Sequence, residues 1–373
     1  MLEMFARNGH EVHVVLPDDG PLVELLQTSG IVVHILPSLA VIDRVRLASL
    51  RGKLTFCFRF FASVYWLSAL ILKLRAGIVH TNTAVLPTPA LAARLTRRPH
   101  LWHIREFFSE FPAIWRFYQR YMWRFSTRII TISSAVQAQF EPRFQDKCTL
   151  VYDGLDEDAM AVDLDKAQRF RSSIGNPAFL IGVVGRIKWA RKGQEVLIKA
   201  AALLAETHPE ARYVIVGTPS PGNEDHLVRL QQLILDLRLE ERVTFTGDIR
   251  DMRDVYAAFD VTVVPSILPE PFGRVVMESM AAGTPVIGSR CGGIPEQIVD
   301  GVTGLLFAPG DEHDLARALA QIMSDDALRG RLGHASRQRF CESFGIPESH
   351  ARFVNVFGIG HPSNEVVAAR DSA

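Results

Sequence analysis

The chain has 373 residues with 41 basic and 41 acidic side chains, so its formal net charge is zero. A neutral chain is a poor candidate for binding nucleic acid through bulk charge. Hydrophobic residues make up 48% and charged residues 22%, which excludes a disordered, collagen-like or disulfide-rich protein. The length favours two domains of ordinary size.

The four cysteines are widely spaced and form no C-x-x-C pair, so neither a zinc site nor a disulfide framework is expected. The first ten residues include Glu3 and lack the apolar core of a signal peptide. Both features favour a cytoplasmic protein. The stretch 54–74 is the most apolar, but Arg59 and Lys73 interrupt it, and it is not predicted as a clean membrane span.

Short β-rich runs alternate with helical ones along the first half of the chain. Strands are predicted at 10–17, 31–36, 77–82, 100–104, 128–133 and 149–152, with helices at 86–96 and 111–125. The same rhythm restarts afterwards, with strands at 179–185, 213–217, 243–247, 261–265, 285–288 and 304–307. Helices are predicted there at 194–206, 226–237, 274–282 and 312–324. This alternation predicts an α/β fold with parallel sheets covered on both faces.

The two halves predict two doubly wound domains facing each other across a cleft. The break falls in the turn-rich segment 152–156, which gives domains at 1–152 and 153–340 and a terminal helix and tail at 341–373. Open α/β sheets bind ligands beyond the carboxyl ends of their strands. Motifs that directly follow a strand are therefore the candidates for function.

The segment 269–278 follows one predicted strand and opens the next helix. Phe272 and Gly273 leave free backbone N–H groups at the helix start, which suits an anion, and glycine lets a ligand approach closely. Glu270 and Glu278 flank this turn and could accept hydrogen bonds from sugar hydroxyls. Alone, each glutamate is better explained as a solvated acid; together with the turn between them they favour a binding site.

The loop 185–193 follows the first strand of the second half. Arg186 and Lys192 bracket this loop, next to the start of a helix, and two cations there suit a diphosphate. A solvated basic loop is the alternative. The loop lacks the Walker pattern. A third strand-to-helix turn contains Gly292 and Gly293 followed by Glu296, and it is either a close-approach site or simply a tight turn.

In the first half, His103 comes at the end of a predicted strand, where it could donate a hydrogen bond to a substrate hydroxyl. His80 occupies a similar position with weaker support. A lone histidine is more often structural than catalytic, so both interpretations stay open.

These motifs together resemble the family 4 glycosyltransferases. Glu270 and Glu278 are similar to the E-x7-E element of that family. Further similar segments are Gly-Arg…Lys-Gly at 185–193, the runs 281–288 and 292–296, Asn-Gly-His-Glu-Val at 8–12, and 151–156. Tyr152 and Asp153 stand where the family more often has Asn before the Gly.

The resemblance implies the GT-B architecture of two Rossmann-like domains and retaining transfer of a hexose from a nucleoside diphosphate sugar, as in polysaccharide biosynthesis. It implies no cofactor and no essential metal. The acceptor would be a glycan or a lipid-linked molecule. Arg186 and Lys192 would hold the diphosphate, Glu278 the ribose, and Glu270 the transferred sugar together with the backbone of Phe272 and Gly273. Arg274 and Val275 would belong to the donor site, and His103 would lie near the anomeric centre.

Family members usually open with a strand and a glycine-rich loop before the helix that precedes Gly9. Here Met1 already falls within that helix, so the resemblance predicts that the usual first strand, at the centre of the sheet, is lacking.

Two segments, 44–75 and 111–124, interleave aromatic and basic residues, as do helices that bind anionic membranes. They predict a first domain that docks at the inner leaflet; two helices packed within the domain are the alternative. Rival functions are a non-catalytic nucleotide-sugar-binding subunit and a GT-B epimerase. A phosphorylase lacks its cofactor lysine motif here, and a dehydrogenase lacks G-x-G-x-x-G after an early strand.

Overall fold

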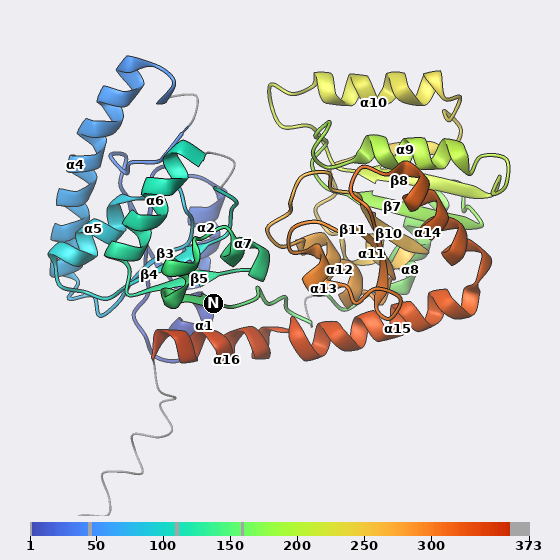
Figure 1. The fold of residues 1–373 in the computed structure, drawn as a ribbon. Coiled ribbons are helices and arrows are strands. Elements are labelled where there is room, and N and C mark those ends of the chain that lie inside the picture. Colours follow the sequence, from blue (N-terminus) through green and yellow to red (C-terminus); the bar gives the residue numbers. More distant parts are fainter. Residues whose placement is uncertain (1, 44–46, 109–111, 158–159, 359–373) are drawn as a thin grey trace, which may run out of the picture. The chain divides into compact units, whose positions relative to one another are not determined.

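The protein is described by a computed structural model that covers every residue except 1, 44–46, 109–111, 158–159 and 359–373. It forms two compact α/β units (Figure 1). Unit 1 comprises Met1–Tyr152 with Ser349–Ala373, and unit 2 comprises Asp153–Glu348. The chain passes from unit 1 to unit 2 between Tyr152 and Asp153, within the turn-rich segment 152–156. Arg44, Arg46, Phe111 and most of the predicted tail lie outside the described residues.

Unit 1 contains a four-stranded parallel sheet in the order β3-β4-β5-β6. Its strands are β3 (Val79–Thr81), β4 (His100–Ile104), β5 (Arg128–Thr131) and β6 (Cys148–Leu150). Among the described residues, two further parallel strands, β1 (His13–Leu16) and β2 (Val32–Ile35), pair only with each other. The single sheet expected for this unit is therefore divided in two.

The two sheets of unit 1 share their covering layers. Val15 of β1 and Val79 of β3 pack into the same hydrophobic cluster, yet no backbone ladder joins these described strands. No residue of β1 is fully buried, whereas every residue of β4 is. Strands inside a parallel sheet are normally buried on both faces. The partial burial of β1 therefore agrees with its place outside the four-stranded sheet.

Helices cover both faces of the four-stranded sheet. Alternate residues of β4 point to opposite faces, so Trp102 and Ile104 pack against α6 while Leu101 packs against α1 and α16. The helices of unit 1 are α1 (Leu2–Arg7), α2 (Pro21–Thr28), α4 (Leu50–Lys73), α5 (Thr88–Leu95), α6 (Pro112–Phe125), α7 (Ser134–Ala138), the 3₁₀ helix η1 (Pro142–Lys147) and α16 (Ile346–Phe357).

Unit 2 contains a six-stranded parallel sheet in the order β12-β11-β10-β7-β8-β9. Its strands are β7 (Phe179–Val184), β8 (Ala211–Val216), β9 (Val243–Gly247), β10 (Val261–Val264), β11 (Val286–Ser289) and β12 (Gly304–Phe307). The chain adds β8 and β9 on one side of β7 and then returns to add β10 on the other side. The carboxyl ends of β7 and β10 therefore form a topological switch point, the usual ligand position in such sheets.

Three helices of unit 2 begin directly after an aspartate that caps them. Asp163, Asp311 and Asp325 each accept backbone hydrogen bonds as N-caps, of α8, α14 and α15 respectively. The helices are α8 (Leu164–Ser173), α9 (Gln194–Leu203), α10 (Asp225–Asp236), α11 (Arg253–Ala258), α12 (Arg274–Ala281), α13 (Ile294–Gln297), α14 (Glu312–Ser324) and α15 (Asp326–Ser343).

The C-terminal part differs from the sequence expectation. The segment 341–373 was expected as a separate terminal helix and tail, but its first residues are the end of α15 in unit 2. From Ser349 onward, α16 belongs to unit 1, where Phe353 and Val356 fill the cluster beside β4 and β5. Hydrophobic periodicity alone does not say which core a terminal helix completes.

Candidate functional site

Two loops meet at the switch point of the unit 2 sheet. One follows β7 and contains Arg186 and Lys192; the other follows β10 and contains Glu270. The Lys192 Nζ atom lies 2.6 Å from the Glu270 Oε2 atom. The structure thus joins two residues that sequence reasoning had selected from separate motifs. Both side chains stay partly open, at 30% and 23% exposure, so a ligand can still reach them.

The loop after β7 is held by contacts to the helix that follows it. The buried side chain of Gln194 donates from Nε2 to the Arg186 carbonyl at 3.1 Å. Glu195 accepts from the Ala190 N–H at 2.7 Å. A Cβ at Gly193 would overlap the backbone of Pro265, so only glycine allows β10 to pass so close to the start of α9. These contacts fix the loop backbone from which the Arg186 and Lys192 side chains extend.

The turn that contains Gly292 and Gly293 holds the backbone of Glu270. The Gly293 N–H donates to the Glu270 carbonyl at 2.8 Å. Gly292 has a φ of +59°, and a Cβ there would overlap the backbone of Glu270. The group that these glycines approach is the backbone of Glu270, within the protein; the approach of a ligand to this turn stays a prediction. Glu296 lies within the short helix α13 that follows.

Glu278 is a partly buried acid held by two partners. The Tyr256 hydroxyl donates to its Oε2 at 2.7 Å, and the Arg274 Nε donates to its Oε1 at 2.8 Å. Only 17% of the Glu278 side chain is exposed, against 73% of Arg274. Burial, and next the charge of Glu278, raise the pKa of Tyr256 well above its usual range, so this phenol stays a hydrogen-bond donor.

The predicted site for the sugar donor also includes Phe272, Gly273 and Val275. None of them has a polar side chain, so each can contribute only its backbone or its position. Phe272 is buried with its ring 5.8 Å from the ring of Phe344, so its side chain packs in the core. Gly273 is the N-cap of α12, and its carbonyl accepts from the Gln297 side chain. Val275 is half-buried in the first turn of that helix. The N–H groups at this helix start fit the expected anion-binding role.

Arg186 is exposed and lines a pocket of about 470 Å³, which was not expected from the sequence. The pocket is formed by the loops at the carboxyl ends of β7, β8 and β9. Its lining includes Gly185, Arg186, Thr218, Pro219, Asp248 and Ile249. A volume of this size is typical of a small-ligand site.

A signal for this pocket was present in the sequence. Gly217 and Gly247 each stand at the end of a strand, and both have positive φ. The Gly217 N–H donates to the Gly247 carbonyl at 2.7 Å, and a Cβ at Gly217 would overlap the backbone of Gly185. Three glycines after three neighbouring strands therefore let these loops converge, but only the sheet order shows that the strands are neighbours.

His103 is not at an open strand end. It lies in β4 with 1% of its surface exposed, and its ring is 5.8 Å from the ring of His80 and 5.5 Å from that of Phe353. Within the described residues neither ring nitrogen has a hydrogen-bond partner. Burial, followed by Arg105 and His80, holds the pKa of His103 well below its usual value. The sequence could not show this burial, because α16 covers the ring from the far end of the chain.

Two family models match the chain. Glycosyltransferase Family 4 covers residues 1–159, and Glycosyl transferases group 1 covers residues 165–339. The chain belongs to the family 4 glycosyltransferases. This confirms the resemblance stated from the motifs. A D-inositol 3-phosphate glycosyltransferase of Stackebrandtia nassauensis is 35% identical over 203 residues, which are 52% of this chain and 45% of that protein. The chain spans about half the length of the curated relatives it matches.

Solved structures confirm the GT-B fold of this family 4 chain. Anabaena HepE in complex with UDP matches with a TM-score of 0.82 and 25% identity, over 96% of this chain and 94% of that one. Sucrose-phosphate synthase from Thermosynechococcus elongatus matches with a TM-score of 0.75 and 24% identity, over 99% and 92%, and supports the fold alone.

Proposed function

We propose that this family 4 glycosyltransferase transfers a hexose from a nucleoside diphosphate sugar to a glycan or lipid-linked acceptor, with retention of anomeric configuration. The observation that carries the proposal is the contact of Lys192 with Glu270 at the switch point, beside Arg186. A site for a nucleotide sugar needs cations for the diphosphate and an acceptor of hydrogen bonds for the sugar, and these loops bring both together.

Each residue has a role in this proposal. Arg186 and Lys192 hold the diphosphate, and the pocket beside Arg186 takes the nucleoside base. Glu278 accepts from the ribose hydroxyls. Glu270, with the backbone N–H groups at the start of α12, orients the transferred sugar. A role for His103 near the anomeric carbon stays a prediction, and the burial of its ring gives it no support.

The reaction breaks the bond between the anomeric carbon and the diphosphate oxygen. Negative charge grows on the departing diphosphate, and preorganised cations that meet it lower the barrier. Arg186 and Lys192 supply this charge, so we propose no essential metal and no cofactor. With retention, the acceptor hydroxyl bonds to the anomeric carbon on the face that the diphosphate leaves, and its proton passes to the departing diphosphate oxygen.

We further propose that the protein works in the cytoplasm, peripherally at the inner face of the membrane, in the assembly of a polysaccharide or glycolipid. The basic and aromatic residues of unit 1 support this location, and the lipid-linked class of acceptor agrees with it.

A thermal-shift screen with UDP-, GDP-, ADP- and dTDP-sugars tests the donor. A ligand at about 100 times its Kd stabilises the folded protein by about 2.7 kcal/mol. UDP-glucose is the first compound, because a solved structural relative is a complex with UDP. We expect one nucleotide class to raise the Tm and Glu278→Ala to abolish the shift. No shift with any donor would contradict the proposal.

Product analysis separates the rival functions. A transferase forms a glycosylated acceptor and releases nucleoside diphosphate in equal amounts. A binding subunit gives the thermal shift without product, and an epimerase converts the donor in the absence of an acceptor. The epimer and the free nucleotide are resolved by anion-exchange chromatography.

A further inference from the structure

Helix α4 of unit 1 has two separate apolar faces. Its buried face consists of Ser63, Val64, Leu67 and Ile71, and the Ser63 Oγ lies 2.8 Å from the Thr88 Oγ1 of α5. Its other face consists of large hydrophobic residues that are 58% to 77% exposed. They are Leu50, Leu54, Phe58, Phe61, Tyr65 and Leu72, and we name them the α4 stripe.

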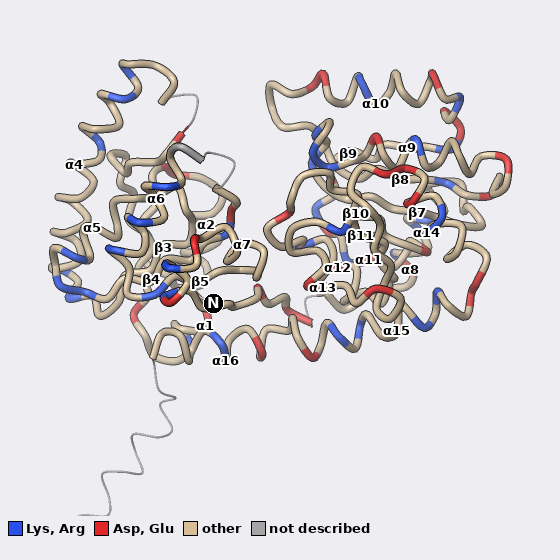
Figure 2. Tube along the Cα trace, viewed as in Figure 1, with Lys and Arg blue, Asp and Glu red and all other residues tan. Residues whose placement is uncertain are grey.

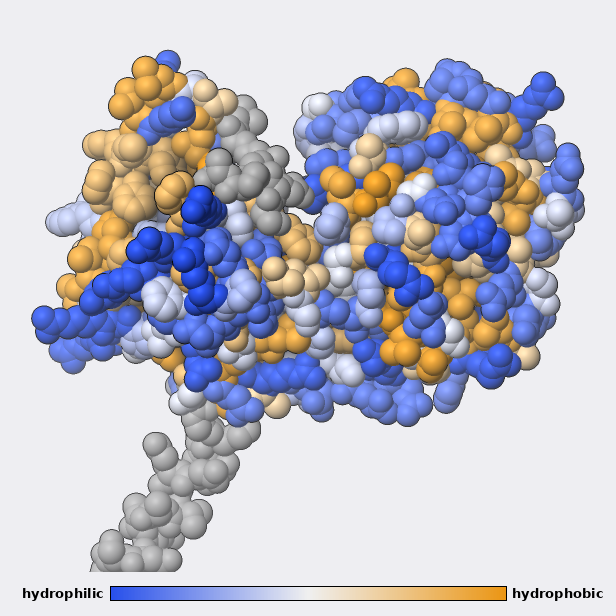
Figure 3. All heavy atoms as spheres, viewed as in Figure 1, coloured by the Kyte–Doolittle hydropathy of each residue, from blue (hydrophilic) through white to orange (hydrophobic). Residues whose placement is uncertain are grey.

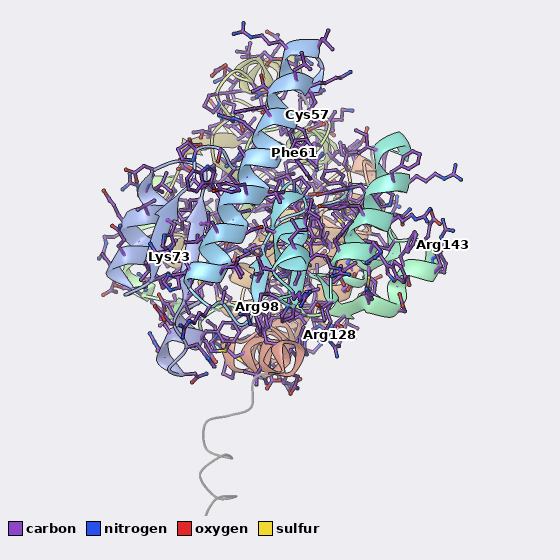
Figure 4. The ribbon with its side chains drawn as sticks, turned by 90° about the vertical axis from the view of Figure 1, so that its left-hand side faces the viewer. Cys57, Phe61, Lys73, Arg98, Arg128 and Arg143 are labelled. Atoms are coloured by element: carbon purple, nitrogen blue, oxygen red, sulfur yellow. The ribbon has the colours of Figure 1, made fainter. Side chains whose placement is uncertain are left out.

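Helical geometry shows that the α4 stripe is one continuous surface. At about 3.6 residues per turn, its six positions fall within an arc of about 80°. The centre of that arc is about 130° from the centre of the buried face. Figure 3 shows hydrophobic residues over α4, and Figure 4 shows Phe61 on the part of the helix that extends away from the unit. Soluble proteins rarely expose a contiguous apolar surface of this kind without a partner.

The N-terminal half of α4 extends past the sheet. The helix has 24 residues and is about 36 Å long, whereas β4 has 5 residues and is about 17 Å long. No residue from Leu50 to Ala62 is fully buried. Figure 1 shows this half extending beyond α5. A short link joins the other end of α4 to the start of β3, so the extending half lies on the side where the carboxyl ends of the strands lie.

The charged residues of helix α4 are all positive. Arg51 and Lys53 are exposed and flank the stripe on opposite sides of the helix, and Lys73 is exposed at its other end. No aspartate or glutamate occurs between Asp43 and Glu106. The trace of α4 accordingly carries Lys and Arg but no Asp or Glu (Figure 2). An apolar face edged by cations is complementary to an anionic bilayer.

We propose that α4 docks unit 1 on an anionic lipid bilayer by lying in the interface with the α4 stripe toward the acyl chains. By length and composition, α4 is the one described helix that could instead cross a membrane. Its buried face opposes that alternative, since a spanning helix would lose its contact with α5, and Arg59 would enter the hydrocarbon.

Docking through α4 gives the proposed peripheral location a specific surface. The reason for this docking rests on the proposed function. Ligands of α/β sheets bind at the carboxyl ends of the strands. The half of α4 that extends from that side would place this edge of unit 1 at the bilayer surface. A lipid-linked acceptor would then reach the sheet edge without leaving the membrane.

Vesicle flotation of the full chain tests the docking. We expect binding to phosphatidylcholine vesicles with 30% phosphatidylglycerol, weak binding to phosphatidylcholine alone, and release in 0.5 M salt. The Phe58→Ser/Phe61→Ser variant should lower the partition coefficient at least tenfold. Arg51→Gln and Lys53→Gln should lower it about fivefold each. The matched control is Val228→Ser/Leu235→Ser on α10 of unit 2, which removes two other exposed hydrophobic residues, at 62% and 52% exposure, and should bind as the wild type does.

A fluorescent label locates the docking surface. Cys57 of α4 and Cys341 of α15 are both exposed. An environment-sensitive maleimide on Cys57, in a Cys341→Ser background, should shift to the blue with anionic vesicles. The same label on Cys341, with Cys57→Ser, should not shift.

Three results would overturn the inference: no flotation of the wild type, unchanged flotation of the Phe58→Ser/Phe61→Ser variant, or a dimer in solution that this variant dissociates while vesicle binding is absent. The last result would assign the α4 stripe to a second copy of the chain. The donor thermal shift, measured on the same samples, keeps the two proposals apart. Flotation without any donor shift would refute the proposed function alone, and a donor shift without flotation would refute the docking alone.

Discussion

The Lys192 ammonium and the Glu270 carboxylate lie 2.6 Å apart although 78 positions separate them in the chain. Each comes from a loop at the carboxyl end of a neighbouring strand, β7 or β10. The acid holds the cation at the strand ends. A diphosphate that enters this site would take Lys192 as a partner, and the sugar would take Glu270.

Loss of the Lys192 cation should impair the departure of the diphosphate. We expect Lys192→Ala to lower turnover by about 10²- to 10³-fold, the usual effect of removing one group that stabilises developing charge. Lys199→Ala is the matched control, because Lys199 lies on the adjacent helix α9 and is 47% exposed. A steady-state assay of nucleotide release measures both. Turnover of Lys192→Ala within threefold of the wild type would refute the assignment.

The hydroxyl of Tyr256 should position Glu278, the acid that we propose for the ribose. Hydrogen bonds to charged groups contribute about 1.5–3 kcal/mol, so Tyr256→Phe should weaken donor binding by about tenfold or more. Glu278→Ala should weaken it further, because that variant removes the carboxylate itself. Calorimetric titration with the nucleotide measures the Kd. Tyr213→Phe, which removes another buried phenol of unit 2, should leave the Kd unchanged.

An alanine at position 292 should displace Glu270. Gly292 and Gly301 both have positive φ, so either substitution strains the backbone by about 1–3 kcal/mol. Only at Gly292 would the new Cβ meet the backbone of Glu270; at Gly301 the space is open. We therefore expect both variants to lose thermal stability and only Gly292→Ala to lose turnover, by tenfold or more. Equal turnover in the two variants would show that the turn does not position Glu270.

Unit 1 should lose stability in mild acid. Burial is the main cause that lowers the pKa of His100 to about 3 and that of His80 to about 4. Unfolding restores the ordinary value near 6.5, so below pH 6.5 the unfolded chain binds protons that the folded chain does not. The free energy of unfolding should then fall by about 1.4 kcal/mol per pH unit for each histidine.

Urea unfolding followed by tryptophan fluorescence measures this dependence. Trp66, Trp102, Trp115 and Trp123 lie in unit 1 and dominate the signal, against Trp189 alone in unit 2. His100→Gln should give a shallower slope between pH 7.5 and 5.5, whereas His313→Gln, an exposed residue of unit 2, should not. A wild-type stability that does not change over this range would contradict the prediction.

The candidate donor motifs stand out in the sequence because their signals are local. A strand that ends in glycine, a basic loop and a helix start occur together at 185–193, and two acids flank a Pro-Phe-Gly turn at 269–278. The pocket of the unit 2 loops could not be predicted, since its walls follow β7, β8 and β9, which only the sheet order makes neighbours. The burial of His103 was missed because α16, from the far end of the chain, covers its ring. The division of the unit 1 sheet is likewise visible only in the pairing of the strands.

The sequence by itself determined the class of fold, the two-unit organisation, the family and the candidate residues of the proposed donor site. These follow from hydrophobic periodicity, glycine and proline positions, and motif spacing, which act within a few residues. Only the tertiary structure decided that Lys192 meets Glu270, that Tyr256 holds Glu278, and that α4 keeps one apolar face free. Such contacts join segments far apart in the chain, because burial depends on which surfaces the folded chain brings together.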